Sequence, residues 1–424
     1  MTALNRMASR LATTLGSSEA DSVDVVVVGA GQAGLATSRE LTVAGIDHVV
    51  LERSRIAQSW RDRWDSFCLV LPNWTLQLPG HAYAGDDPDG FMPRDDIVAY
   101  LESYATDSKA PVREGVEVVG IRPSQPGWIV ETSNGDLQTA VVIAATGAFQ
   151  TAVRPVGSES LAESVLQLDV GRYRNPDALP PGKVLVVGSG QSGCQVAEDL
   201  VRGGREAFLA CGRSPWLPRR VGDRDIFWWA TESGFMDTPV TALSDPIERL
   251  APNPQLSGRD GGHDLNLRTL VGMGVTLVGH FKGSNGQVAY FAPDLAASVA
   301  AGDQVYSQFS QLIRTVAKER GISVDDLAEP LPWEFEGPDA IDLAGFGAVI
   351  YAAGFRPNYR PWIDAPQAFD LLGFPIQDMS GSGALPGLHF VGVHFIRKRK
   401  SALFSGVGED ASIVVNAVET YLSR

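Results

Sequence analysis

The chain has 424 residues, of which 44% are hydrophobic and 20% charged, so it can bury a sizeable core over two or three domains. Its net charge of −15 argues against nucleic-acid partners and anionic membranes. The three cysteines form no CxxC pair and the six histidines no metal-ligand spacing, which excludes a dithiol centre and a zinc ribbon. No apolar run approaches the roughly 20 residues that span a bilayer, so we expect a cytoplasmic protein.

The chain opens with a region, residues 1–22, that lacks a continuous apolar stretch and is predicted to be a flexible leader. A run of β-branched residues over 23–28 predicts a strand buried on both faces. Gly29, Gly31 and Gly34 follow it, then a helix that Gly45 can end, and a second strand that ends at Glu52. Strand, glycine-rich turn, helix and strand together make a βαβ unit that can hold a dinucleotide pyrophosphate.

A second copy of this unit begins with a strand at residue 183 and continues through Gly188, Gly190 and Gly193. Glu52 follows the first glycine of its copy by 23 residues, and Cys211 stands at the same offset in the second copy, with Arg213 two residues later. A carboxylate at this offset binds ribose hydroxyls, so the first site suits FAD or NAD. A guanidinium binds a 2′-phosphate, so the second site suits NADP, although Arg213 is also compatible with a solvated surface position.

Further elements follow from local patterns. Strands are predicted over 140–146 and 348–353, a hairpin over 275–291 turning at 284–286, and helices over 294–320 and 409–422. The basic run at residues 397–400 is interpreted as a solvated loop. The region from 221 to 345 matches no motif that can be interpreted chemically, and we expect it to shape a substrate site or an interface.

The two glycine motifs, the strand ends at Gly147 and Gly354, and the runs at 58–64, 71–74, 90–94 and 167–173 resemble the two-dinucleotide-binding flavoproteins. More narrowly, they resemble class B flavin monooxygenases and the related bacterial NADPH-dependent flavin oxidoreductases. The resemblance implies an α/β fold of two Rossmann-like dinucleotide-binding domains, with the NADPH domain inserted into the FAD domain. The expected division is a leader (1–22), the first segment of the FAD domain (23–155), the NADPH domain with a mixed region (156–340) and the second segment of the FAD domain (341–424).

The resemblance also implies roles for individual residues. Asn73 would face the isoalloxazine and the nicotinamide as the catalytic residue, although an Asn turn beside Pro72 is equally compatible with the sequence. Val118 would contact the adenine of FAD through its backbone. The residues predicted to bind the cofactors FAD and NADPH are Gly29, Gly31, Gln32, Ala33, Gly34, Glu52, Arg53, Trp60, Arg61, Val118, Gly147, Gly188, Gly190, Gln191, Ser192, Gly193, Arg213 and Gly354.

The implied reaction reduces FAD with NADPH, forms a C4a-hydroperoxyflavin with dioxygen and oxygenates a small organic substrate at nitrogen, sulfur or a ketone carbon. The helix at 409–422 would place its positive end beside the flavin, or would be a plain packing helix. One departure leaves an alternative open: Asp169 stands at the family's histidine position and Val165 at its glycine position, and only Tyr173 remains. The alternatives are a flavin reductase or dehydrogenase that passes electrons to another acceptor, and a dinucleotide sensor without turnover. A homodimer is also left open.

Overall fold

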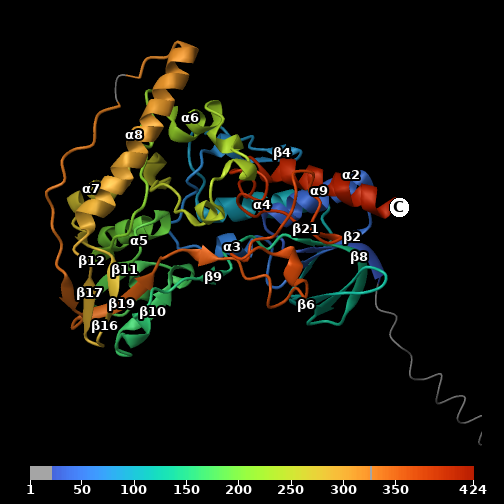
Figure 1. The fold of residues 1–424 in the computed structure, drawn as a ribbon, viewed down its shortest axis with the longest axis horizontal. Helices are drawn as coiled ribbons and strands as arrows, with labels where there is room; N and C mark the ends of the chain where they lie inside the picture. The colour runs from blue at the N-terminus through green and yellow to red at the C-terminus, as the bar shows by residue number, and fades with distance from the viewer. Residues whose placement is uncertain (1–21, 325–326) are drawn as a thin grey trace, which may run out of the picture.

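The computed structural model describes residues 22–324 and 327–424. The predicted leader lies outside this part of the chain, apart from Ser22. The described chain forms two α/β units, each built on its own sheet (Figure 1). This arrangement confirms the predicted fold class.

The first unit contains a seven-stranded sheet with the order β5-β2-β1-β8-β7-β6, with β21 also paired to β8. Its strands are β1 (Ser22–Val28), β2 (His48–Glu52), β5 (Val112–Glu114), β6 (Val118–Pro123), β7 (Trp128–Thr132), β8 (Leu137–Ala144) and β21 (Leu388–Phe390). The pairs among β5, β2, β1, β8 and β21 are parallel, whereas β6 and β7 form an antiparallel extension.

Alternate residues of β1 pack into different cores, as predicted for a strand buried on both faces. Val25 and Val27 face a cluster shared with helices α2 (Gln32–Ala44), α4 (Arg94–Asp107) and α9 (Val407–Leu422). Val26 and Val28 face a second cluster on the other side, which includes β6, β7 and β21. The three helices lie together over the first sheet in Figure 1. The last predicted helix therefore exists, beginning two residues earlier than expected.

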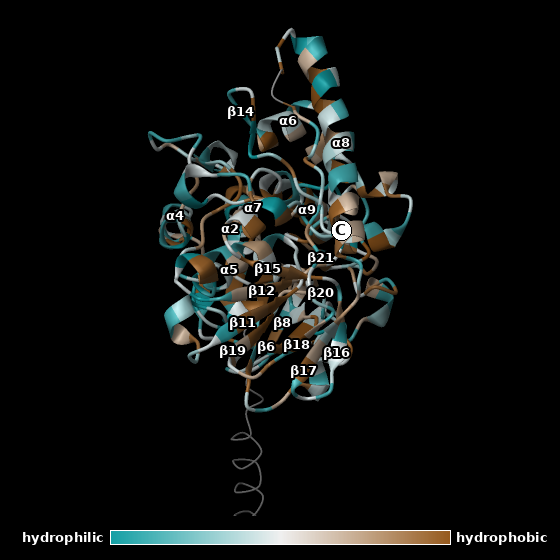
Figure 2. Ribbon diagram, turned by 90° about the vertical axis from the view of Figure 1, so that its left-hand side faces the viewer, coloured by the Kyte–Doolittle hydropathy of each residue, from teal (hydrophilic) through white to brown (hydrophobic). Residues whose placement is uncertain are grey.

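The second unit contains an all-parallel sheet with the order β10-β19-β11-β12-β15. Its strands are β10 (Leu166–Asp169), β11 (Lys183–Val187), β12 (Ala207–Ala210), β15 (Thr276–Val278) and β19 (Phe346–Tyr351). Helices α5 (Gln191–Arg202) and α7 (Leu267–Gly272) pack on one face, and the small sheet of β16 (Phe281–Ser284), β17 (Val288–Phe291) and β18 (Ala340–Asp342) packs on the other. Figure 2 shows the hydrophobic residues concentrated in these central strands.

Two sequence-based boundaries differ from the structure. The predicted hairpin is confined to β16 and β17, because residues 276–278 instead extend the parallel sheet beside β12. β19 also belongs to the second sheet, so the chain regains the first sheet only at β21 and not at residue 341. The two connections between the units, β9 (Thr151–Ala152) and β20 (Phe355–Arg356), pair antiparallel directly after Gly147 and Gly354.

Helix α8 (Leu295–Arg320) confirms the long helix predicted from residue 294 and ends at Gly321 in the left-handed conformation. It packs with α6 (Ile226–Glu232) around a separate hydrophobic cluster and extends beyond the two sheets (Figure 1). No helix in residues 22–324 and 327–424 is long and apolar enough to cross a membrane.

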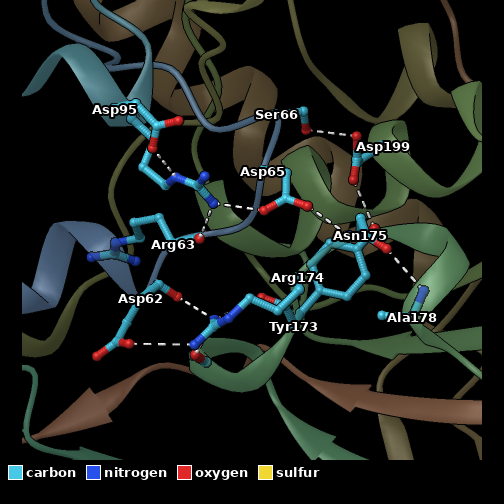
Figure 3. Close-up of polar contacts among 12 residues, drawn as sticks. Asp62, Arg63, Asp65, Ser66, Asp95, Tyr173, Arg174, Asn175, Ala178 and Asp199 are labelled. Atoms are coloured by element: carbon cyan, nitrogen blue, oxygen red, sulfur yellow. Dashed lines mark hydrogen bonds and ion pairs between the residues drawn. The ribbon is translucent and has the colours of Figure 1, made fainter. Parts of the chain in front are cut away.

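A polar seam joins the two units where α5 meets the segment after α3 (Gln58–Arg61) (Figure 3). Asp199 of α5 is buried, and its carboxylate accepts hydrogen bonds from Ser66 at 2.6 Å, Tyr173 at 2.7 Å and Arg259 at 2.8 Å. Each partner comes from a different segment, so this one carboxylate fixes how three segments meet.

The neighbouring Asp65 extends the seam toward α4. It pairs with Arg94 at 2.6 Å and accepts a hydrogen bond from Asn175 at 2.6 Å, and these two contacts lower its pKa. The carboxylate of Asp62 likewise accepts a hydrogen bond from the guanidinium of Arg174 at 3.3 Å. Both anchors connect the first unit to the segment between β10 and β11 of the second unit.

Glu198, beside Asp199 on α5, is 1% exposed and contacts Arg202 at 2.9 Å and His263 at 2.8 Å. The hydrogen bond that the His263 imidazole donates to Glu198 raises the pKa of His263 above its usual value. Because the folded pKa is raised, the protonated imidazole stabilises the fold below its unfolded pKa, and this contribution is lost as the pH rises through the folded pKa.

We expect His263→Gln to lower the free energy of unfolding by about 1.5 kcal/mol near pH 5.5, and by much less near pH 8.5, because only the protonated imidazole forms an ion pair with Glu198. Denaturant titration at both pH values measures the difference. The exposed His280, changed to Gln, is the matched control. A loss of the same size at both pH values would contradict a role for the protonated ring.

Candidate functional site

The first glycine-rich turn is shaped by contacts that no side chain can replace. Gly29 has φ of +103°, and a Cβ on Gly34 would lie 1.8 Å from the carbonyl oxygen of Gly29. Gly31, by contrast, faces open space, with no atom within 4 Å of an added Cβ. The turn is therefore tight on the protein side and open on the other, as a bound pyrophosphate requires.

Helix α2 begins at this turn with no side chain capping its first N–H groups and no acidic residue in its first turn. Its unsatisfied amide donors and positive end suit an anion. Gln32, the first helical residue, accepts a hydrogen bond from Trp60 at 3.0 Å and donates to the carbonyl of Ala402 at 3.3 Å. Trp60 in turn stacks on Phe404 with ring centroids 5.6 Å apart. The hydrogen bond between Gln32 and Trp60 thus brings two of the residues predicted to bind a cofactor into contact.

Glu52 lies at the end of β2 beside the same turn. Its carboxylate accepts the N–H of Ala30 at 2.9 Å and that of Ser54 at 3.0 Å. Its own carbonyl accepts the N–H of Val116 at 3.0 Å, which brings the start of β6, Val118, toward this end of the sheet. Carboxylate oxygens retain further lone pairs, so sugar hydroxyls can still donate to Glu52.

The two arginines predicted to bind the cofactor differ in their surroundings. Arg53 is exposed and makes no hydrogen bond or ion pair within the described part of the chain. Arg61 instead donates to the carbonyl of Ile56 at 3.1 Å and pairs with Glu102 of α4. Arg61 therefore holds α3 against α4, and the structure gives no separate indication that it meets a nucleotide.

Gly147 and Ala33 both lie close to the strand end of β21. A Cβ on Gly392 would be 2.4 Å from the Cβ of Ala33, and the nearest atom to an added Cβ on Gly147 is the carbonyl oxygen of Gly392 at 4.0 Å. The carbonyl of Gly147 accepts the hydroxyl of Tyr359 at 2.6 Å. These contacts join the returning segment to the first turn.

Asn73 opens a short 3₁₀ turn, Asn73–Thr75, and is 5% exposed. Its amide N–H₂ donates to the carbonyl of Asp87 at 2.9 Å, and its backbone N–H donates to Gly90 at 2.9 Å. The side-chain oxygen is buried and has no hydrogen-bond partner among residues 22–324 and 327–424. Since buried polar atoms are rarely left unpaired, this oxygen is a candidate acceptor for a ligand N–H or O–H.

The segment after Asn73 reaches the start of α9, where a Cβ on Gly408 would be 2.9 Å from Pro79. The uncapped N-terminus of α9 therefore lies close to the Asn73 segment, and Ala402, just before this helix, contacts Gln32. This arrangement brings the segment that follows Asn73, the first glycine-rich turn and a second positive helix end into one region.

The basic run at 397–400 is not the solvated loop that we expected. Arg397 is buried and pairs with Asp410 at 2.6 Å, while Lys398 pairs with Glu409 at 2.8 Å. Lys398 and Lys400 both contact Asp237, at 3.0 and 2.9 Å. Burial opposes ionisation of Glu409, but the ammonium of Lys398 holds its pKa below the usual value. The prediction of a solvated loop was wrong because the acidic partners lie about ten residues away or more, where no local pattern indicates them.

The second glycine-rich turn repeats the geometry of the first. Gly188 has φ of +110°, and a Cβ on Gly193 would lie 1.8 Å from its carbonyl oxygen. Around Gly190 only Pro252, at 4.0 Å, approaches an added Cβ. Helix α5 also starts without a capping side chain or an early acidic residue, so this turn too can receive an anion.

The surroundings of the second turn differ from those of the first in charge. Cys211 is buried, and burial raises the pKa of its thiol, so no anion stands where Glu52 does. Arg213 is exposed and has no hydrogen bond or ion pair within the described residues. Gln191 donates to the carbonyl of Pro254 at 3.1 Å, and Ser192 follows it, half-buried, in the first turn of α5. Gly354 lies beyond β19 with φ of +93°.

The described residues contain no cluster of His, Cys, Asp and Glu that could hold a metal ion. All three cysteines are free, and two of them, Cys194 and Cys211, are buried.

Comparison with known proteins shows which proteins this chain resembles. The pattern of the pyridine nucleotide-disulphide oxidoreductase family matches residues 26–222. An uncharacterized CzcO-like oxidoreductase of Geobacillus kaustophilus is 31% identical over 401 residues, covering 93% of this chain and 98% of that protein. The indole-3-pyruvate monooxygenase YUCCA4 of rice is 26% identical, covering 93% of this chain and 86% of its own length. A flavin-containing monooxygenase from Stenotrophomonas maltophilia has the same fold, with a TM-score of 0.65 at 21% identity, covering 95% and 99% of the two chains.

The chain belongs to the family of the CzcO-like oxidoreductases. It is a flavin-dependent oxidoreductase. FAD and NADPH, the cofactors predicted from the sequence, agree with this membership and with the two open turns. Phe404, which stacks on Trp60, and the Arg397–Asp410 pair at the start of α9 were missed by the sequence analysis, since no local motif marks them.

The paired glycines of the first turn allow a direct test of the site. Gly34→Ala should lower the free energy of unfolding by about 3 kcal/mol, because the new methyl overlaps a backbone oxygen. Gly31→Ala should change the stability of the apoprotein by less than about 0.5 kcal/mol, since its methyl meets no protein atom. It should nevertheless weaken FAD binding. Thermal unfolding and flavin fluorescence titration measure the two effects, and wild-type FAD affinity in Gly31→Ala would place the pyrophosphate elsewhere.

Proposed function

We propose that this protein is an NADPH-dependent FAD monooxygenase that oxygenates a small organic molecule. The observation that carries the proposal is the pair of open nucleotide turns with opposite electrostatic surroundings in one chain. A carboxylate, Glu52, stands beside the first turn, and an unpaired guanidinium, Arg213, stands beyond the second. The first arrangement favours ribose hydroxyls and the second favours a 2′-phosphate.

Residues at the first turn would hold FAD: the amides at the start of α2 would bind the pyrophosphate, Glu52 the ribose and Trp60 the wall of the ring site. When bound, the flavin supplies two-electron reduction by a nicotinamide and activation of dioxygen. The overall reaction consumes NADPH, a proton, dioxygen and the substrate, and gives NADP⁺, water and the oxygenated product. The positive end of α9 would stabilise negative charge near the ring.

Asn73 would act as a hydrogen-bond acceptor at the reacting side of the ring. One N–H of its amide is donated to the carbonyl of Asp87, and its carbonyl oxygen has no partner among the described residues. A nicotinamide amide or a hydroperoxide O–H can donate to such an oxygen. The sequence alone offered both a donor and an acceptor, and the unpartnered oxygen supports the acceptor role.

The second candidate is a flavin reductase or dehydrogenase that passes electrons to another acceptor. It is favoured by Asp169, which replaces the family's histidine and is engaged by Arg154 at 2.7 Å. The guanidinium carbon of Arg154 also lies 4.8 Å from the centroid of the Tyr351 ring. Arg154 is therefore held by two contacts, and it holds Asp169 in turn.

Rapid mixing of the NADPH-reduced holoenzyme with oxygenated buffer separates the two candidates. A monooxygenase should pass through a transient absorption spectrum that belongs to neither reduced nor oxidised flavin. A reductase should return directly to the oxidised spectrum, and that result would contradict the proposed function. A protein that neither retains flavin nor is bleached by NADPH would be a sensor.

In the same experiment, Asn73→Ala should shorten the lifetime of the transient species about tenfold or more, because a hydrogen bond in a water-excluded site is lost. Peroxide released per NADPH, measured by a peroxidase-coupled assay, should appear correspondingly faster. Gln77→Ala, an exposed change four residues away, is the control. An unchanged lifetime in Asn73→Ala would assign this residue to the turn alone.

A further inference from the structure

The residue after the first glycine differs between the two nucleotide turns, and so does the bridge that it makes. In the first turn this residue is Ala30, whose N–H is bound by Glu52 at 2.9 Å. In the second turn it is Ser189, and Cys211 takes the place of the glutamate. The Cys211 thiol donates to the carbonyl of Leu209 at 3.4 Å and also contacts the side chain of Ser189, but it carries no carboxylate to bind the turn's N–H groups.

In the second turn, the side chain of Ser189 itself joins the turn to the segment that follows β12. Its hydroxyl donates to the carbonyl of Gly212 at 3.1 Å and accepts the N–H of the same residue at 3.0 Å. The hydroxyl of Ser214 lies 3.4 Å away. Ser189 is only 1% exposed, so these bonds do not compete with bulk water. Gly212 and Ser214 flank Arg213, so one hydroxyl holds the backbone before Arg213 and contacts the side chain of the residue after it.

Gln255, from the region that matched no motif, supports the same contact. Its amide donates to the carbonyl of Ser189 at 2.8 Å, and its backbone N–H donates to Pro215 at 2.9 Å. Gln255 is 1% exposed. It therefore ties the glycine-rich turn to the residue after Ser214, and the segment that carries Arg213 is held at both ends.

We propose that Ser189 is a positioning residue for nucleotide specificity, which holds Arg213 where it binds the adenosine 2′-phosphate. The proposal rests on the proposed function only in taking NADPH as the nucleotide. A neutral hydroxyl does the bridging that a carboxylate does in the first turn, so no negative charge repels the phosphate. An exposed, unpaired arginine loses conformational entropy on binding, and a backbone fixed in advance reduces that cost.

The test compares binding of 2′-phospho-ADP-ribose and ADP-ribose to the FAD-loaded protein by calorimetry at low salt. Ser189→Ala should weaken binding of 2′-phospho-ADP-ribose about tenfold, the loss of about one well-placed hydrogen bond, and should change ADP-ribose binding less than about twofold. Arg213→Ala should abolish the preference between the two ligands. Adding Ser189→Ala to Arg213→Ala should cost nothing further, because the serine acts through the arginine.

Steady-state kinetics gives an independent readout. In Ser189→Ala the KM for NADPH should rise while its kcat and the KM for NADH stay within about twofold of wild type. Ser189→Cys keeps the shape of the side chain and a weak donor, so its KM for NADPH should lie between those of the wild type and Ser189→Ala. This variant replaces Ser189→Ala in the test if the alanine variant does not fold. Equal losses for both ligands would show that Ser189 only maintains the turn, and would overturn the proposal.

These outcomes are separable from failure of the proposed function, because the binding assay needs no turnover. A wild-type protein that binds both ligands equally would overturn NADPH as the nucleotide and the role of Ser189 with it. A wild-type protein that discriminates, with a Ser189→Ala variant that discriminates as well, would overturn only the role of Ser189.

Discussion

Both nucleotide sites depend on one backbone contact, the approach of the third glycine of each motif to the carbonyl of the first. A side chain on Gly34 or Gly193 would lie 1.8 Å from that oxygen, so each helix can start directly above the strand that precedes it only when glycine is present. The contact aims the free amides of the helix N-terminus across the end of the sheet. Ser189 lies within the second turn, and Glu52 binds the first turn from the end of β2.

The glycine turns, the buried strands and the long helices were predictable because their signals are local: residue spacing and β-branched runs decide them within a few positions. The charged contacts were not, since a sequence gives the charge of a residue without its partner. Arg397 meets Asp410 thirteen positions later, and Ser66 meets Asp199 from the other unit. Ser189 and Gln255 were missed for the same reason: neither is exceptional in sequence, and their importance arises only when distant segments meet.

The polar seam and the hydrophobic core do different work in joining the two units. The largest apolar cluster runs without interruption from the first sheet to the second, so apolar burial favours their association without fixing its geometry. Asp199 and Glu198 add direction, because each buried carboxylate is stable only while its partners occupy set positions. Buried ion pairs contribute little net stability once desolvation is counted, and their effect is better seen as fixing one arrangement among several. The relative orientation of the two nucleotide turns depends on that arrangement.

At both nucleotide turns, free carboxylates are kept away from the helix N-terminus, although the protein carries a net charge of −15. The first turns of α2 and α5 have no acidic residue, and Cys211 replaces the carboxylate in the second site. The first turn of α9 does contain Glu409 and Asp410, but Lys398 and Arg397 hold both. Because the pKa of Glu409 is lowered, this pairing persists over the neutral range and the positive end of α9 is not cancelled by free carboxylates. Glu52 is the exception, and it stands where sugar hydroxyls, which need an acceptor, are expected. The distribution of carboxylates therefore follows the chemistry of two bound dinucleotides and not the acidic character of the chain as a whole.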